Sequence, residues 1–152
     1  MGAVYFYHLT ESPLDAALPM LVDRARGAGW RVLVRGSDRA LLERLDALLW
    51  QGTPESFKAH GLATGGPQDA LQPVLLGEAE ATGFDCVMSI GGAGITAEEV
   101  AALERACVIF DGQDGAAVQV ARGQWKALTD AGASAQYWAQ DDGRWVKKAE
   151  TG

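Results

Sequence analysis

Two hydrophobic periods alternate along the chain, and each of them predicts one kind of element. An apolar, aromatic run at residues 4–9 is typical of a β-strand. From residue 14 to residue 25, apolar residues recur at spacings of three and four, which indicates one face of a helix. We expect Ser12 to cap this helix and Pro13 to occupy its first position.

The same alternation continues along nearly the whole sequence. Ser37 or Asp38 is expected to cap a second helix, whose apolar face is formed by leucines. Thr96 and Glu99 have the spacing of a capping box at the start of another helix, which we expect to end near residue 105. The remaining elements are a helix at residues 113–131 and strands at residues 30–35, 74–76, 84–90, 107–110, 134–139 and 144–146.

This order of elements predicts the fold. Because strands alternate with helices, we expect a Rossmann-like α/β domain, in which a mostly parallel sheet is covered by helices on both faces. Residues 51–73 interrupt the alternation with an irregular segment rich in Gly and Pro. A segment of that length is expected to be functional or to face a partner. A chain of 152 residues fits a single domain across residues 1–152.

The composition, with 48% hydrophobic and 22% charged residues, is that of an ordinary globular protein. No apolar run approaches the roughly 18 residues of a membrane span. No basic residue precedes the first apolar segment, as one would in a signal peptide. Cys86 and Cys107 lie in apolar runs and are expected to be small buried residues in a reducing compartment. We therefore expect a cytoplasmic protein that does not associate with membranes.

The net charge of −7 is concentrated in the middle of the chain. Residues 59–104 carry seven acidic and no basic residues, whereas the segments on either side are balanced. An acidic protein of this kind is not expected to bind nucleic-acid phosphates directly. The basic residues near the C-terminus form two clusters, one at Arg122 and Lys126 and one at residues 144–148.

The helix expected at residues 113–131 carries the first of these clusters beside an aromatic residue. Arg122 and Lys126 are four residues apart, and Trp125 lies between them at the three-residue spacing, so the three share one face. This face suits an acidic ligand that also carries an apolar group. It does not suit covalent chemistry, because no nucleophile, base or metal ligand accompanies it. The alternative is a solvated charged face on which Trp125 partly covers the sheet.

A glycine-rich turn offers a function of a different class. Gly92, Gly94 and Ala97 fit the pattern G-x-G-x-x-A between a strand and a helix, and Asp111 ends the next strand. In dinucleotide-binding enzymes, such a turn lets phosphates approach a helix N-terminus. The lysine of a phosphate-binding Walker loop is missing. A plain strand-to-helix turn explains the same residues equally well.

Other candidate sites are weaker. His8 and His60 lack partners at metal-ligand spacing, so we expect no metal site at either. We expect His8 to be a strand residue and His60 to be a loop residue. No nucleophile elbow occurs, and we expect neither a cofactor nor enzymatic activity. Trp50, at a predicted helix end, and Phe57, in the loop after it, either cover the core edge or anchor a protein partner.

Three stretches, taken together, are similar to one known family. These are Leu45-Asp-x-x-Leu-Trp50-x-x-x-x-Glu55-Ser-Phe57-x-x-His60-x-Leu-Ala63, then Phe110-Asp-Gly with Ala121-Arg122-x-x-Trp125-Lys126, and finally Tyr137-Trp138-x-Gln140 with Gly143-Arg144-Trp145. In these stretches the chain resembles the chi subunit of the bacterial DNA polymerase III holoenzyme.

The resemblance implies an α/β fold without an enzymatic site and an accessory role at the clamp loader. It implies that the protein holds the acidic C-terminal tail of single-stranded DNA-binding protein, which ends in phenylalanine. Arg122 and Lys126 would bind the carboxylates of this tail, and Trp125 would line a pocket for its last ring. Trp50 and Phe57 would face the psi subunit or an equivalent component. The alternative is a small dinucleotide-binding enzyme that uses Gly92, Gly94 and Asp111.

Overall fold

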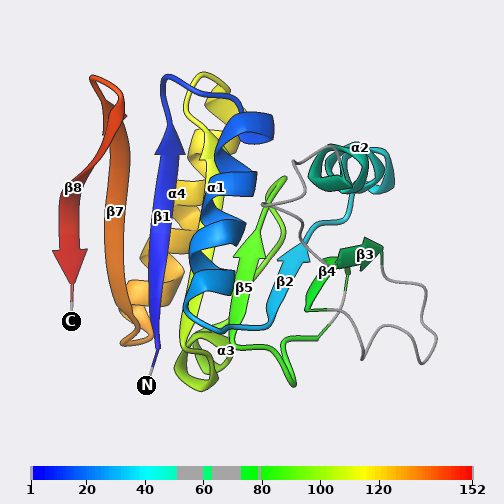
Figure 1. Ribbon diagram of the computed structural model, residues 1–152. Coiled ribbons are helices and arrows are strands. Elements are labelled where there is room, and N and C mark those ends of the chain that lie inside the picture. The colour runs from blue at the N-terminus through cyan, green and yellow to red at the C-terminus, as the bar shows by residue number, and fades with distance from the viewer. Residues whose placement is uncertain (1, 51–59, 63–72, 79, 152) are drawn as a thin grey trace.

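The computed structural model describes residues 2–50, 60–62, 73–78 and 80–151 (Figure 1). Its elements in chain order are β1 (Ala3–Leu9), α1 (Leu14–Gly27), β2 (Val32–Arg35), α2 (Arg39–Trp50), β3 (His60–Leu62), β4 (Val74–Gly77), β5 (Cys86–Ser89), α3 (Ala97–Ala102), β6 (Arg105–Asp111), α4 (Gly115–Asp130), β7 (Ser134–Asp141) and β8 (Arg144–Thr151).

The described strands form one sheet in the order β3-β4-β2-β5-β6-β1-β7-β8. All neighbouring pairs from β3 to β7 are parallel, and β7 pairs with β8 in the antiparallel sense. β1 lies between β6 and β7, where Phe6 is beside Val108 on one side and Tyr137 on the other. The predicted Rossmann-like α/β fold with a mostly parallel sheet is therefore confirmed.

Each face of the sheet is covered by two helices. Because side chains alternate along a strand, Val4 and Phe6 of β1 pack on the face of α3 and α4, whereas Tyr7 and Leu9 pack on the face of α1 and α2. Figure 1 shows α1 in front of the sheet and α4 behind it. The two faces are thus separate surfaces, each with its own core.

The loop between β1 and α1 differs from the expectation, because Ser12 does not cap α1. The N-cap residue is Pro13, which makes no side-chain capping hydrogen bond. Gln140 of β7 organises this loop instead. Its Oε1 accepts hydrogen bonds from the backbone N–H groups of Thr10, Glu11 and Ser12 at 3.0, 2.8 and 2.9 Å. Its Nε2 donates to the Ser12 hydroxyl at 2.9 Å.

Two other helix starts agree with the sequence. Asp38 Oδ1 accepts a hydrogen bond from Leu41 N–H at 3.3 Å, so Asp38 caps α2. Thr96 and Glu99 form the expected capping box at α3. The helix α3 is shorter than expected, because the N–H groups of Glu104 and Arg105 already donate to the Asp85 carbonyl at 2.8 and 3.2 Å and so begin β6.

Two strands also depart from expectation. The segment 51–73, expected to be irregular, contains β3, which pairs with β4 at the sheet edge and includes the backbone of His60. His60 is therefore not a loop residue. At the other edge, β8 is longer than predicted and continues to Thr151. It follows a two-residue turn at Asp142 and Gly143, whose φ angles of 52° and 77° fit the tight Asp-Gly hairpin.

Candidate functional site

Helix α4 carries the cationic face expected from the sequence. The Asp114 carboxylate begins the helix by accepting hydrogen bonds from the N–H groups of Ala116 and Ala117 at 3.0 and 3.4 Å. Ala121 and Leu128 are buried against the sheet. Arg122 and Lys126 are exposed. The helix thus directs its two cations to solvent.

Trp125 is half-buried, and its ring is held by two aromatic neighbours. It meets Phe6 of β1 edge to face, with ring centroids 5.3 Å apart. It meets Tyr137 of β7 in the same manner at 5.9 Å. Such contacts fix the ring orientation. Trp125 therefore packs on the sheet and also borders the two exposed cations, so the two interpretations drawn from the sequence are compatible.

The two cations have different surroundings. Lys126 Nζ lies 3.1 Å from Asp130 Oδ2 one helical turn later, in an ion pair whose side chains are 79% and 65% exposed. Arg122 acts on the hydroxyl of Tyr137: burial raises the pKa of Tyr137, and the positive charge of Arg122 partly opposes that rise. The Tyr137 hydroxyl is therefore a neutral group within the electrostatic reach of Arg122.

His8 and Phe110 extend this aromatic surface. His8 is a strand residue, as expected, and its Nδ1 lies 2.7 Å from the Tyr137 hydroxyl. Its ring stacks on Phe110 with centroids 4.9 Å apart. Sequence reasoning did not connect Tyr137 with Trp125. The pattern that could have connected them is the alternation of side chains along β7, which directs Tyr137 toward α4 and Trp138 toward α1.

The predicted anchors for a second protein partner lie outside the described structure. Trp50 is the last residue of α2, and the placement of its side chain lies outside the described structure. Phe57 lies wholly outside the described residues. Whether these rings cover the core or face a partner stays a prediction.

The glycine-rich turn is a tight turn in which the Ala93 N–H donates to the Ile90 carbonyl at 3.1 Å. Gly91 and Gly92 have φ angles of 60° and 80°, which explains the need for glycine at these two positions. The Ala93 carbonyl accepts hydrogen bonds from the Ser89 hydroxyl and from Gln124 Nε2, the latter at 2.9 Å. Gly94 has no positive φ, and a side chain there would meet nothing within 4 Å.

The surroundings of this turn argue against a bound dinucleotide. Gly92 and Asp111 do line a common hollow of about 350 Å³, but the other ionisable side chain that lines it is Asp114, and no Lys or Arg does so. At the N-terminus of α3, the Glu99 carboxylate already accepts the Thr96 N–H at 3.0 Å. The pKa of Glu99 is held below its usual range by hydrogen bonds from Arg35, with which it forms an ion pair at 2.7 Å, so both charged groups at this helix start already have partners.

Asp111 has a local partner as well, because its Oδ1 accepts the N–H of Gln113 at 2.9 Å. The free cysteines Cys86 and Cys107 are buried, as expected. Within the described part of the chain, no group of three or more His, Cys, Asp or Glu side chains could hold a metal ion. No helix in the same part is both long enough and apolar enough to cross a membrane.

Comparison with known families identifies the family of the chain. A family model described as "DNA polymerase III chi subunit, HolC" matches residues 1–136. The chain belongs to this family. The match covers α4 with its cations and ends just before Tyr137, where the last of the three resembling stretches begins. A search of curated proteins finds no match.

Membership of the chi family confirms the identification made from the sequence. A chi subunit is an accessory subunit of DNA polymerase III, so the protein is assigned to DNA replication. The glycine-rich turn contributes nothing to this assignment.

Proposed function

We propose that this chi-family protein is a non-enzymatic adaptor that links the clamp-loader assembly to single-stranded DNA-binding protein. It holds the acidic C-terminal tail of that protein, which ends in phenylalanine. It works in the cytoplasm and contacts neither nucleic acid nor membranes directly, in keeping with its net charge of −7. Its membership of the chi family supports a place in the polymerase assembly.

The observation that carries the proposal is the pairing of exposed cations with an anchored ring on α4. No ion pair joins Arg122 to an acid among the described residues. Lys126 pairs with Asp130, but both side chains are mostly exposed. Exposed pairs contribute about 0–1 kcal/mol. A carboxylate of the tail can therefore replace Asp130 at little cost.

The ring supplies the apolar part of the site. Phe6 and Tyr137 hold Trp125 in place, so its exposed edge is available to a second ring without loss of side-chain freedom. Burial of an aromatic side chain contributes about 1.5–3 kcal/mol, which exceeds the contribution of one exposed charge. We infer that the terminal phenylalanine of the tail sets most of the affinity. Arg122 and Lys126 set the specificity and the salt dependence.

A second partner is needed for an adaptor, and the face that carries α2 is the candidate. We propose that Trp50 and Phe57 contact the psi subunit or an equivalent clamp-loader component. The helix α2 packs on the opposite face of the sheet from α4. Two partners on opposite faces do not compete, so both can be bound at the same time.

Binding of a labelled acidic peptide that ends in phenylalanine, followed by fluorescence anisotropy, tests the proposal. The double variant Arg122→Ala, Lys126→Ala should bind several-fold more weakly, up to about 30-fold, since two contacts of about 0–1 kcal/mol each are lost. The matched control is Lys147→Ala, Lys148→Ala on β8, which also removes two exposed cations and should leave binding unchanged. Equal affinity of the two double variants would remove α4 from the site. Saturable binding of NAD would support the dinucleotide alternative.

A further inference from the structure

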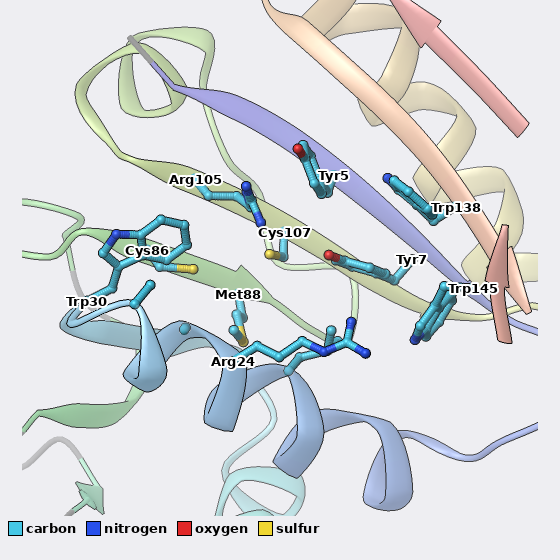
Figure 2. A pocket seen from close by; sticks show the side chains of 13 residues that line it. Tyr5, Tyr7, Arg24, Trp30, Cys86, Met88, Arg105, Cys107, Trp138 and Trp145 are labelled. Atoms are coloured by element: carbon cyan, nitrogen blue, oxygen red, sulfur yellow. The ribbon is translucent and has the colours of Figure 1, made fainter. Parts of the chain in front are cut away.

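A second cavity lies on the sheet face opposite α4, between α1 and the strands. It has a volume of about 430 Å³ and is lined by side chains from α1, the loop between α1 and β2, and five strands (Figure 2). Five of its 13 lining residues are aromatic, and its cations are Arg24 and Arg105. The volume is within the range of small-molecule sites, about 300–1,000 Å³. None of the residues proposed to hold the acidic tail lines this cavity.

The Arg105 guanidinium packs against two aromatic rings. Its guanidinium carbon lies 4.0 Å from the centroid of the Tyr5 ring and 5.2 Å from that of the Trp30 ring. A cation–π contact of this kind does not use up the N–H donors of the guanidinium, which can still bind an acceptor. Among the described residues, no carboxylate pairs with this guanidinium.

Arg24 brings a second cation from α1 to the same cavity, and it too lacks an acidic partner among the described residues. Figure 2 shows Arg24 and Arg105 on different sides of the space in front of Tyr7. Two unneutralised cations in one cavity of an acidic protein attract an anion. The cavity therefore favours a negatively charged ligand.

Tyr7 supplies a hydrogen-bond donor on the floor of the cavity. Its side chain is buried, and burial raises the pKa of its hydroxyl far above the usual value, so the group stays protonated. The Tyr7 hydroxyl makes no hydrogen bond within the described part of the protein and points into the cavity (Figure 2). It can donate to an oxygen of the ligand.

Trp138 and Trp145 complete the apolar side. The Trp145 ring meets Tyr7 edge to face, with centroids 5.0 Å apart, and the Trp138 ring lies 6.2 Å from Tyr5. These rings offer flat surfaces to a planar group. We propose that this cavity binds an aromatic ring that carries a carboxylate, with the carboxylate at Arg24, Arg105 and the Tyr7 hydroxyl and the ring against the indoles.

The ligand can be a free aromatic acid or the C-terminal residue of a protein chain, because both have this chemistry. An adjoining hollow of about 480 Å³ shares Arg24, Trp138 and Trp145 with the cavity. It continues past Arg144 and Met20, and Met20 is 56% exposed. A free acid needs the cavity alone, whereas the end of a chain also passes through this hollow.

Titration calorimetry with N-acetyl-phenylalanine tests the inference, with the amide of the same compound as the uncharged comparison. We expect saturable binding of one equivalent of the acid and at least tenfold weaker binding of the amide. Arg105→Gln should weaken binding of the acid by a similar factor. Since Arg105 also packs on two rings, Arg24→Gln is the second variant; its side chain is exposed, so the fold does not depend on it. The matched control is Arg39→Gln on α2, which does not line the cavity.

Absence of saturable binding would overturn the inference. Equal affinity for the acid and the amide would do the same, as would a full affinity for the acid in both Arg24→Gln and Arg105→Gln. The variant Arg144→Gln separates the two sources. It should leave the affinity for N-acetyl-phenylalanine unchanged. It should lower the affinity for an acidic peptide ending in phenylalanine only when the end of that peptide occupies the cavity.

The same peptide separates this inference from the proposed function. If Arg24→Gln abolishes peptide binding and the α4 double variant does not, the ligand of the cavity is a chain end and the α4 site fails. If the α4 double variant abolishes peptide binding while N-acetyl-phenylalanine still binds the cavity, both sites stand.

Discussion

Removal of the Asp130 carboxylate should strengthen binding of the acidic tail. Asp130 Oδ2 lies 3.1 Å from Lys126 Nζ, so the tail must displace the Asp130 carboxylate to bind this lysine. An ion pair of this i,i+4 kind is worth about 0.3–0.5 kcal/mol. Asp130 also repels the carboxylates of the tail, by about 0.6 kcal/mol for each charge about 7 Å away in water. The variant Asp130→Asn removes both effects.

Together these effects amount to about 1 kcal/mol before screening, which corresponds to about fivefold in affinity. With a Debye length of about 30 Å at 0.01 M salt and about 10 Å at 0.1 M, screening reduces the gain to about fourfold and about twofold, respectively. Fluorescence anisotropy of the labelled peptide at the two salt concentrations measures both values.

The matched control for this prediction is Asp141→Asn. Asp141 forms an ion pair with Lys148 at 3.8 Å at the β7–β8 edge and is 63% exposed, close to the exposure of Asp130. This variant should leave the affinity unchanged apart from the small effect of net charge. If Asp130→Asn fails to strengthen binding, or if Asp141→Asn strengthens it equally, the tail does not lie along α4.

Four other predictions concern the peptide, the fold and the second partner. Removal of the terminal phenylalanine from the peptide should cost more affinity than Lys126→Ala, and the reverse order in anisotropy would show that charge dominates. Gln140→Ala should lower the free energy of unfolding by about 1–2 kcal/mol in urea titrations, because it removes the common acceptor of three N–H groups, while Gln119→Ala at an exposed position of α4 should have little effect. Trp50→Ala and Phe57→Ala should keep the circular dichroism spectrum and lose the second protein partner in a pull-down; a lost spectrum would mean that the rings belong to the core. Since the folded pKa of Glu99 lies below its ordinary value of 4.5, its stabilisation is present above that pH and is lost as pH falls through the folded pKa, so Glu99→Gln should show a shallower loss of stability in acid than Glu98→Gln.

Outside residues 51–73, where β3 was missed, the sequence was sufficient for the order of elements because the local signals agree with one another. The capping box at Thr96 and the leucine stripe after Asp38 depend on residues a few positions apart, and both are present in the structure. The role of Gln140, which takes the place of the expected Ser12 cap before α1, could not be predicted in this way. Gln140 reaches the β1–α1 loop from a strand 128 residues further along the chain, and no local pattern encodes that contact.

In the candidate sites too, local features were predicted from the sequence and contacts between distant segments were not. Helical spacing alone was enough to group Arg122, Trp125 and Lys126, because all three belong to α4. The packing of Trp125 on Phe6 depends on the sheet order and was not predicted. The cavity beneath α1 was missed entirely, since Tyr5 and Arg105 become neighbours only when β1 pairs with β6.

The central claim is that α4 holds an acidic tail, and NMR of isotope-labelled protein titrated with the tail peptide tests it most directly. The account predicts shifts at the amides of Arg122 and Lys126 and at the indole N–H of Trp125. The indole signals of Trp30 and Trp145, on the opposite face, report separately on the cavity beneath α1. Shifts confined to those two indoles, or no shifts at a saturating peptide concentration, would contradict the account.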